Sequence, residues 1–294
     1  MTSKLFYSDR IRDYYTLTKP GIIYGNLLSA VGGYFFGAQG VIHLSSFLAA
    51  AIGTSSIIAS ACVFNNYIDR HIDARMQRTH KRALPGGRIP LRQAIIFGST
   101  LGFTGLIVLI LGTNLPTLLL GVTGWLTYVV VYTYAKPRTV HATLLGSIPG
   151  ATPIAAGYTA ATGRFDVAAL LLFSIMVVWQ LPHFYAISMF RRDDYAAAGV
   201  PVLAVVKGMA VTARTILGCI SVLVVAFVAL YSFGGASASL TLGMVGIVLY
   251  WLAAGWRQPD SDSAYSPWAR RMFRLSLIVL LSLCVALALD HWLP

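Results

Sequence analysis

The sequence has 294 residues, of which 57% are hydrophobic and only 11% are charged. This composition excludes a water-soluble globule and predicts an all-α, polytopic membrane protein. The net charge of +12 does not indicate a nucleic-acid partner, because the basic residues are spread along the chain between apolar stretches. Such a distribution suits membrane lipids with anionic headgroups and anionic substrates.

Apolar stretches of about 20 residues recur along the chain, and this is the length that crosses a bilayer as a helix. We expect about nine transmembrane helices around a central cavity open to the cytosolic side, in a single domain of residues 1–294. The first apolar stretch begins too late and is too long for a removable signal peptide. The predicted spans are 17–38, 44–68, 93–112, 116–135, 142–161, 167–190, 210–232, 237–256 and 272–291.

The basic residues alternate between connections in a way that predicts an orientation. The N-terminal tail and the connections after the second, fourth, sixth and eighth spans hold 21 of the 22 Lys and Arg residues, and Arg164 alone lies on the other side. By the positive-inside rule, the N-terminus lies in the cytosol and the C-terminus on the external side of the cell membrane.

The second predicted span ends in three polar residues, Asn65, Asp69 and Asp73, at positions i, i+4 and i+8. At about 100° per residue they share one helix face, with the carboxylates about 6 Å apart along the axis. A row of oxygen ligands suits Mg²⁺, which uses one or two carboxylates together with substrate phosphates. The alternative, a helix end with Asp–Arg surface pairs, leaves the regular spacing unexplained.

Basic residues beside this acidic row predict a diphosphate site. The cytosolic connection 71–92 is unusually long, which makes it a candidate lid, and the fourth span ends on the same side. The diphosphate-binding candidates are Arg70, Arg78, Lys81, Arg82, Lys136 and Arg138. For the last two, snorkelling at the membrane interface is an equally good interpretation.

The sixth predicted span carries the other concentration of polar residues. Gln180 and His183 lie two to three turns inside it, where a histidine is more often functional than structural. Asp193 and Asp194 follow in the cytosolic loop 191–208, either as further metal ligands or as part of a solvated charge cluster. On a continuous helix, His183 and Asp194 would be about 16 Å apart along the axis, too far to act on one atom.

Three further features carry expectations. Asn26, two turns inside the first span, is either a helix-packing hydrogen bond or a substrate contact. The fifth span is rich in Gly, Ala, Ser and Thr, which predicts close backbone packing and a kink or cavity. The stretch from Trp268 to Arg274, in the eighth connection, is expected to anchor the chain at the membrane interface. The candidates for contact with an apolar or aromatic substrate are Asn26, Gln180, His183 and Tyr185.

The acidic row followed by Arg78-Thr79 resembles the first acidic motif of the intramembrane aromatic prenyltransferases, the UbiA superfamily. Further motifs extend the resemblance over nearly the whole chain and narrow it to the branch that prenylates haem: Leu17-Thr-Lys-Pro20, Tyr134-Ala-Lys136, Trp179-Gln-Leu-Pro-His183, Asp194-Tyr195 with Gly199-x-Pro201, and Trp268-Ala-Arg-Arg271. Two positions depart from the family pattern. Pro137 replaces a cation, and Asp193-Asp194 replaces two aspartates four residues apart.

The resemblance implies farnesyl transfer from farnesyl diphosphate to a vinyl group of haem B, with addition of water. It implies Mg²⁺ as cofactor, held by Asn65, Asp69 and Asp73, with Asp193 and Asp194 as less secure ligands. Haem B is then a substrate rather than a prosthetic group, and a haem A synthase or a second copy of the chain is a conceivable partner. The alternatives are a prenyltransferase for a quinone-precursor ring, a secondary transporter with ligands near the midplane, and a haem-binding assembly factor.

Overall fold

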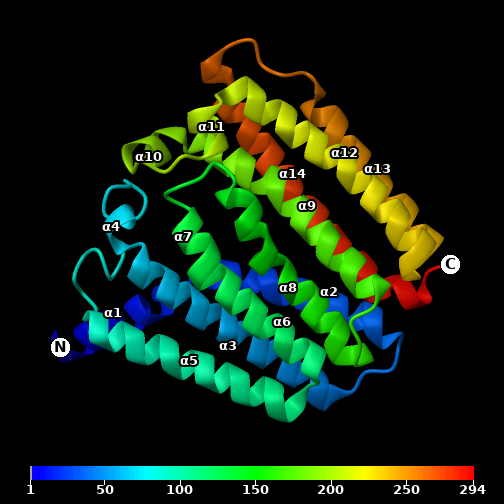
Figure 1. The fold of residues 1–294 in the computed structure, drawn as a ribbon, viewed down its shortest axis with the longest axis horizontal. Coiled ribbons are helices and arrows are strands. Elements are labelled where there is room, and N and C mark those ends of the chain that lie inside the picture. The colour runs from blue at the N-terminus through cyan, green and yellow to red at the C-terminus, as the bar shows by residue number, and fades with distance from the viewer. Residues whose placement is uncertain (1) are drawn as a thin grey trace.

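The computed structural model describes residues 2–294, with side chains from residue 9 onward, and this part of the chain is helical without any strand (Figure 1). The helices are α1 (Thr2–Leu17), α2 (Pro20–Ala38), α3 (Leu44–Ile68), α4 (Arg70–Asp73), α5 (Leu91–Gly112), α6 (Leu115–Leu126), a π-helix (Thr127–Tyr132), α7 (Thr133–Ala135), α8 (Ala142–Thr162), α9 (Val167–Phe190), α10 (Arg192–Ala197), α11 (Leu203–Val206), α12 (Met209–Gly234), α13 (Ala238–Trp256), α14 (Asp262–Leu289) and a 3₁₀-helix (Asp290–Trp292).

Each of the nine predicted spans coincides with helical structure in residues 2–294. Seven helical segments are long and apolar enough to cross a membrane, with α6 through α7 counted as one. Helices α2 and α8 have sufficient length but contain many Gly, Ser and Thr residues, which lower their hydropathy. The fold is therefore that of a multi-pass membrane protein, whereas the count of nine spans stays a prediction.

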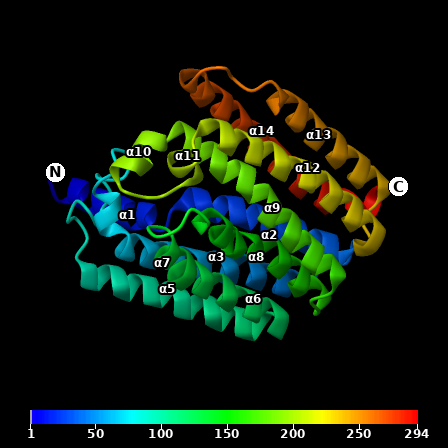
Figure 2. The same cartoon turned by 45° about the horizontal axis from the view of Figure 1, so that its top comes forward.

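Helices α2 and α8 pack against each other in the middle of the bundle (Figures 1 and 2). Helices α3, α5 and α6 lie on one side of this pair, and α9, α12, α13 and α14 lie on the other. A methyl group on Gly157 of α8 would clash with the carbonyl oxygen of Ala30, and one on Gly33 of α2 would clash with that of Ile154. Only glycine lets the backbones of α2 and α8 approach each other this closely, so the close backbone packing predicted for the fifth span is confirmed.

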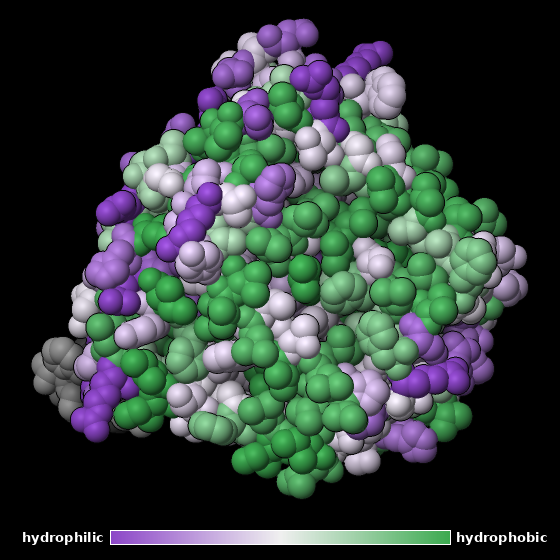
Figure 3. Space-filling model, in the orientation of Figure 1, coloured by the Kyte–Doolittle hydropathy of each residue, from purple (hydrophilic) through white to green (hydrophobic). Residues whose placement is uncertain are grey.

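A broad apolar surface lies between two polar edges of the molecule (Figure 3). The N-terminus, the connections 74–90 and 191–202 and the α13–α14 connection gather at one edge (Figure 1). The α2–α3 and α12–α13 connections and the C-terminus lie at the opposite edge. The structure thus places the basic connections together, as their alternation predicts, and leaves open which edge faces the cytosol.

The N-terminal tail is a helix, α1, that docks onto the loop after α4. Asp13 accepts two hydrogen bonds of 2.8 Å from the guanidinium of Arg88. Asn66 donates to the backbone carbonyl of Leu17 at 2.8 Å, and the ring of Tyr14 packs edge-on against Phe97. These contacts connect the start of the chain to the 74–90 loop, to α3 and to α5.

The ring of Trp268 lies inside the protein, so any anchoring by residues 268–274 falls to the exposed Arg270, Arg271 and Arg274. Helix α14 begins at Asp262, ten residues before the predicted span, and Trp268 is 7% exposed. Its indole nitrogen donates to the carbonyl of Gly255 at 3.3 Å, so the ring packs between α13 and α14. Burial satisfies its one polar atom, and nothing requires the headgroup region.

We expect the Asp13–Arg88 pair to stabilise α1 in a pH-dependent way. The hydrogen bond from Arg88 lowers the pKa of Asp13. The contribution is therefore present above the unfolded aspartate pKa of about 3.9 and is lost as pH falls through the lower folded value. At pH 7, Asp13→Asn should cost at most about 1 kcal/mol, because Arg88 is half-exposed. Thermal unfolding in detergent should show that this difference shrinks at pH 3, and an equal difference at both pH values would contradict the assignment.

Candidate active site

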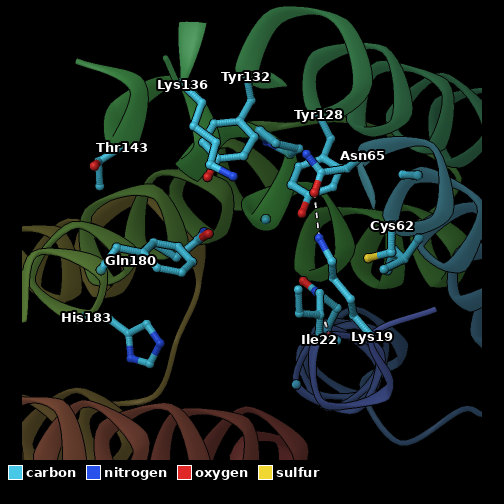
Figure 4. Close-up of a pocket in the computed structure, with 18 of the residues that line it drawn as sticks. Lys19, Ile22, Cys62, Asn65, Tyr128, Tyr132, Lys136, Thr143, Gln180 and His183 are labelled. Atoms are coloured by element: carbon cyan, nitrogen blue, oxygen red, sulfur yellow. Dashed lines mark hydrogen bonds between the residues drawn. The ribbon is translucent and has the colours of Figure 1, made fainter. Parts of the chain in front are cut away.

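A cavity of about 440 Å³ opens between α2, α3, α6, α8, α9 and α14 (Figure 4). Its polar end is lined by Lys19, Asn65, Asp73, Arg78, Arg82 and Lys136. Its deeper part is lined mainly by apolar side chains, among them Ile57, Ile58, Trp125, Met176 and Leu280. The cavity is therefore amphipathic and suits a ligand with an anionic head and a hydrocarbon tail.

Asn65, Asp69 and Asp73 keep their regular spacing in space although α3 ends at Ile68. The amide of Asp69 donates to the carbonyl of Asn65, and the amide of Asp73 donates to that of Asp69, each at 2.8 Å. This i to i−4 pattern carries the helical geometry across the junction with α4. All three side chains are at most 3% exposed.

Each member of the acidic row is paired with a different cation. Lys136 Nζ lies 2.5 Å from Asp69 Oδ2, and Arg82 Nη1 lies 2.7 Å from Asp73 Oδ2. Buried carboxylates require such partners, because removing an unpaired charge from water is costly. Both cations come from outside α3, so folding of the 74–90 loop and of the α7 end completes the site.

The donor set fits Mg²⁺. Only one oxygen of each carboxylate takes part in an ion pair. Asn65 and Asp73 line the cavity, whereas Asp69 is not among the lining residues and meets Asn65 and Lys136 beside it. No cluster of three His, Cys, Asp or Glu side chains suited to a metal occurs in the described part of the chain. Mg²⁺ typically uses one or two protein carboxylates and completes its coordination with water and substrate phosphate.

Lys19 is a site residue for which the sequence analysis predicted no role, although it belongs to the Leu17-Thr-Lys-Pro20 motif. It adopts the left-handed conformation, with φ 54°, immediately before Pro20 and the start of α2. This conformation is costly for a residue with a side chain. It aims the ammonium at Asn65 Oδ1, 2.5 Å away (Figure 4), and over the ring of Tyr128 at 6.0 Å. The only sequence signal was a lysine before a helix-starting proline.

The fourth predicted span contains a π-helix at Thr127–Tyr132 that the sequence did not indicate. The rings of Tyr128 and Tyr132 stack at 5.4 Å, and both line the cavity. Asn65 donates to the hydroxyl of Thr133 at 3.0 Å, which fixes the end of this segment against α3. Such single-turn π segments are frequent at functional sites, because they redirect side chains within a helix.

His183 and Gln180 line the cavity on the side opposite Lys19 (Figure 4). The Nδ1 atom of His183 is 2.7 Å from the hydroxyl of Ser276, and its ring stacks on Trp179 at 5.0 Å. Gln180 donates to the carbonyl of Ser147 at 3.1 Å, which joins α9 to α8. The Nε2 atom of His183 has no hydrogen-bond partner in the described part of the chain, so a ligand can approach it.

Several predicted diphosphate residues do not line the cavity. Arg70 donates to the backbone carbonyl of Tyr67 at 2.7 Å, and its guanidinium lies over the ring of the same residue. Lys81 is exposed. Arg138 lies 3.7 Å from the centroid of Tyr134 and is also exposed. Arg138 thus does not replace the cation that Pro137 removes, because it stacks on the outer surface.

The second acidic pair also lies outside the cavity lining. Asp193 is exposed, and Asp194 is 3.8 Å from Arg191. Helix α9 ends at Phe190 and α10 begins at Arg192, so the continuous helix assumed between His183 and Asp194 is broken, and the 16 Å separation does not apply. Tyr185 packs in the hydrophobic core, whereas Asn26 lines the cavity and donates to the carbonyl of Ile22.

The model of the UbiA prenyltransferase family matches residues 26–278, and the chain belongs to this family. The chain is 43% identical over 287 residues to a Protoheme IX farnesyltransferase of Yersinia enterocolitica, covering 97% of this chain and 96% of that protein. It is therefore an enzyme of the prenyltransferase class.

Two solved structures share the fold. One is described as digeranylgeranylglyceryl phosphate synthase in membranes, with TM-score 0.76, 17% identity and coverage of 95% of this chain and 99% of that one. The other is a UbiA homolog from Archaeoglobus fulgidus bound to GPP and Mg²⁺, with TM-score 0.70, 14% identity and coverage of 91% and 99%. At such low identities the likeness shows the fold alone.

Proposed function

We propose that the protein transfers a farnesyl group from farnesyl diphosphate to a vinyl group of haem B, with addition of water, to give haem O and diphosphate. The observation that carries the proposal is one cavity that has cations at its polar end, an apolar interior and His183 on the wall opposite Lys19. The near-full-length similarity to a Protoheme IX farnesyltransferase supports the choice of donor and acceptor. The whole chain, 1–294, is taken as one catalytic domain.

The cations at the polar end of the cavity are arranged to bind the diphosphate. Lys19, Arg82 and Lys136 are buried or half-buried and now neutralise the acidic row. A bound diphosphate offers the same cations a partner of higher charge, which releases carboxylate oxygens toward a metal ion. When bound by Asn65, Asp69 and Asp73, Mg²⁺ would neutralise the diphosphate as a leaving group. Arg78 reaches the same end of the cavity.

The proposed farnesyl transfer is balanced in atoms and electrons and needs no oxidant or reductant. The bond between farnesyl C1 and the diphosphate oxygen breaks, and its electron pair leaves with diphosphate. The terminal vinyl carbon of haem B bonds to C1, water adds its oxygen to the inner vinyl carbon, and one proton is released. The rings of Tyr128 and Tyr132 line the cavity near Lys19 and the acidic row, and the ring of Trp125 lines its deeper part. These rings would stabilise allylic cation character while excluding early water.

His183 and Gln180 would serve the acceptor. The hydrogen bond with Ser276 orients the imidazole and leaves Nε2 to bind the haem iron or to position the vinyl group. Gln180 presents its carbonyl oxygen beside Gly150, where a side chain would clash with it. An acceptor comparison tests this assignment: haem B should be farnesylated at least 100-fold faster than a quinone-precursor ring. The reverse preference would favour the alternative prenyltransferase.

We propose that nine helices span the cell membrane, with the active-site edge in the cytosol. His80→Cys lies in the loop after α4, and Val41→Cys lies in the exposed α2–α3 connection at the opposite edge. A membrane-impermeant thiol reagent should label position 41 in intact cells, and position 80 only after the membrane is opened. The native Cys62 and Cys284 are buried and should give little background, whereas Cys219 is half-buried and is replaced by Ala in both variants. Reversed labelling would overturn the orientation.

A further inference from the structure

A row of aromatic rings leads from the cavity to the surface between α9 and α14. The ring of His183 lies 5.0 Å from Trp179 and 4.8 Å from Phe273. Phe273 in turn lies 5.7 Å from Phe190, at the last residue of α9. Trp179, His183, Phe273 and Phe190 are called the aromatic row below. Trp179 and His183 line the cavity, and Phe273 and Phe190 continue the aromatic row from there to the end of α9 at the polar edge.

Two arginines converge on the outer end of the aromatic row. The guanidinium carbon of Arg270 is 4.9 Å from the centroid of Phe190, and that of Arg191 is 5.9 Å from the same centroid. Arg191 has one weak acidic partner, Asp194 at 3.8 Å, and Arg270 has no ion-pair partner in the described part of the chain. Two like charges beside one ring repel each other, and an anion bound between them would relieve that repulsion.

The size of the cavity indicates that the acceptor extends toward these arginines. A volume of about 440 Å³ is at the low end for a pocket that encloses one drug-sized ligand. The proposed reaction needs a farnesyl chain and a tetrapyrrole together. Phe184 and Leu277 line the cavity and yet are 40% and 44% exposed, so the wall beside His183 is open to the outside. Part of the acceptor can therefore lie along the aromatic row.

We propose that Arg191 and Arg270 form a carboxylate-binding subsite for the acceptor. The inference rests on the proposed function and deepens it. Haem B has its vinyl groups on one edge and its two propionates on the opposite edge. With a vinyl group at the acidic-row end of the cavity, the propionates point along the aromatic row to Arg191 and Arg270. This subsite would select acceptors that carry carboxylates opposite the reacting vinyl group.

Anionic lipid phosphate is the other anion available at this edge. The continuity of the aromatic row with His183 favours the acceptor, because a lipid headgroup would need the two cations but not the row. A binding titration separates the two sources. Haem B and its dimethyl ester share the ring and differ only in the propionate charge. Vesicles of neutral lipid, compared with vesicles containing anionic lipid, report a headgroup site.

The variants are Arg191→Gln and Arg270→Gln, with Arg257→Gln, an exposed arginine at the end of α13, as the matched control. Binding is followed by haem absorbance on the full-length protein in neutral vesicles. Each variant should weaken haem B binding by about tenfold, as expected for loss of one charge-assisted contact. The ester should bind wild type and variants alike, and binding of a non-hydrolysable farnesyl diphosphate analogue should stay within twofold, which verifies folding.

An equal loss for haem B and its ester, or no loss for either, would overturn the subsite. An effect of the variants that requires anionic lipid would assign the arginines to headgroups and also overturn it. Turnover is measured separately on the wild type. If haem B binds in an arginine-dependent way but no farnesylated product forms, the proposed function fails while the carboxylate subsite stands.

Discussion

Asp69→Asn is expected to lower turnover by two to three orders of magnitude, comparable to the loss of one charge-stabilising group in an enzyme site. Asp69 is 2% exposed, accepts from Asn65 and Lys136, and is a proposed Mg²⁺ ligand. Asparagine keeps the shape but removes the negative charge that would hold the metal. The measurement is the initial rate with limiting Mg²⁺, together with binding of a non-hydrolysable farnesyl diphosphate analogue, which should weaken.

The same substitution leaves Lys136 as a buried charge without its partner, which alone can destabilise a protein by about 3–5 kcal/mol. The double variant Asp69→Asn/Lys136→Gln separates the two effects, because it removes both charges. We expect the double variant to recover thermal stability but not turnover. Recovery of near-wild-type turnover in either variant at limiting Mg²⁺ would show that Asp69 is not a ligand.

His183→Ala is expected to reduce haem O formation by at least 100-fold while binding of the farnesyl diphosphate analogue stays within a few-fold. The physical reason is position: His183 lies on the far wall of the cavity from Lys19 and Asn65, and its hydrogen bond goes to Ser276 of α14. Paired titrations check this, one with the analogue and one following haem absorbance. Asp73→Asn should give the opposite pattern, with analogue binding lost and haem binding kept.

Conservative variants test whether His183 acts on the acceptor or only packs. His183→Gln can keep a hydrogen bond to Ser276 but offers no imidazole, and Ser276→Ala keeps the imidazole but loses its orientation. If His183 contacts the acceptor, His183→Gln should remain defective and shift the haem absorbance spectrum, whereas Ser276→Ala should retain part of the activity. Full activity of His183→Gln would show that the histidine only packs and does not act on the acceptor.

Helix positions were predictable where a long apolar run meets polar residues at both ends. Residues 44–68 and 167–190 agree with α3 and α9 for this reason. The start of α14 was not predicted, because residues 262–271 carry charges and a proline. They nevertheless form the first turns of the helix, with Tyr265 and Trp268 buried. The sequence also did not predict that the N-terminal tail is a docked helix, because Asp13 of α1 pairs with Arg88, 75 residues later.

The acidic row was predictable because its spacing is a property of one helix. The sequence did not show which cations face the acidic row. Lys136 and Arg138 are only two residues apart, yet the turn after α7 directs Lys136 to Asp69 and Arg138 onto the ring of Tyr134. The left-handed backbone of Lys19 and the π-helix that turns Tyr128 and Tyr132 into the cavity leave no local sequence pattern. Both are fixed by packing against α3, a contact between distant segments.

The central claim is that one cavity joins a prenyl diphosphate to haem. Purified protein in vesicles, supplied with haem B, farnesyl diphosphate and Mg²⁺, tests it most directly, with the product pigment measured by mass spectrometry. We predict a haem heavier by one farnesyl group and one hydroxyl, formed together with an equal amount of diphosphate and abolished by a chelator. Unmodified haem B after complete release of diphosphate, or farnesyl transfer to a quinone-precursor ring but not to haem, would contradict the account.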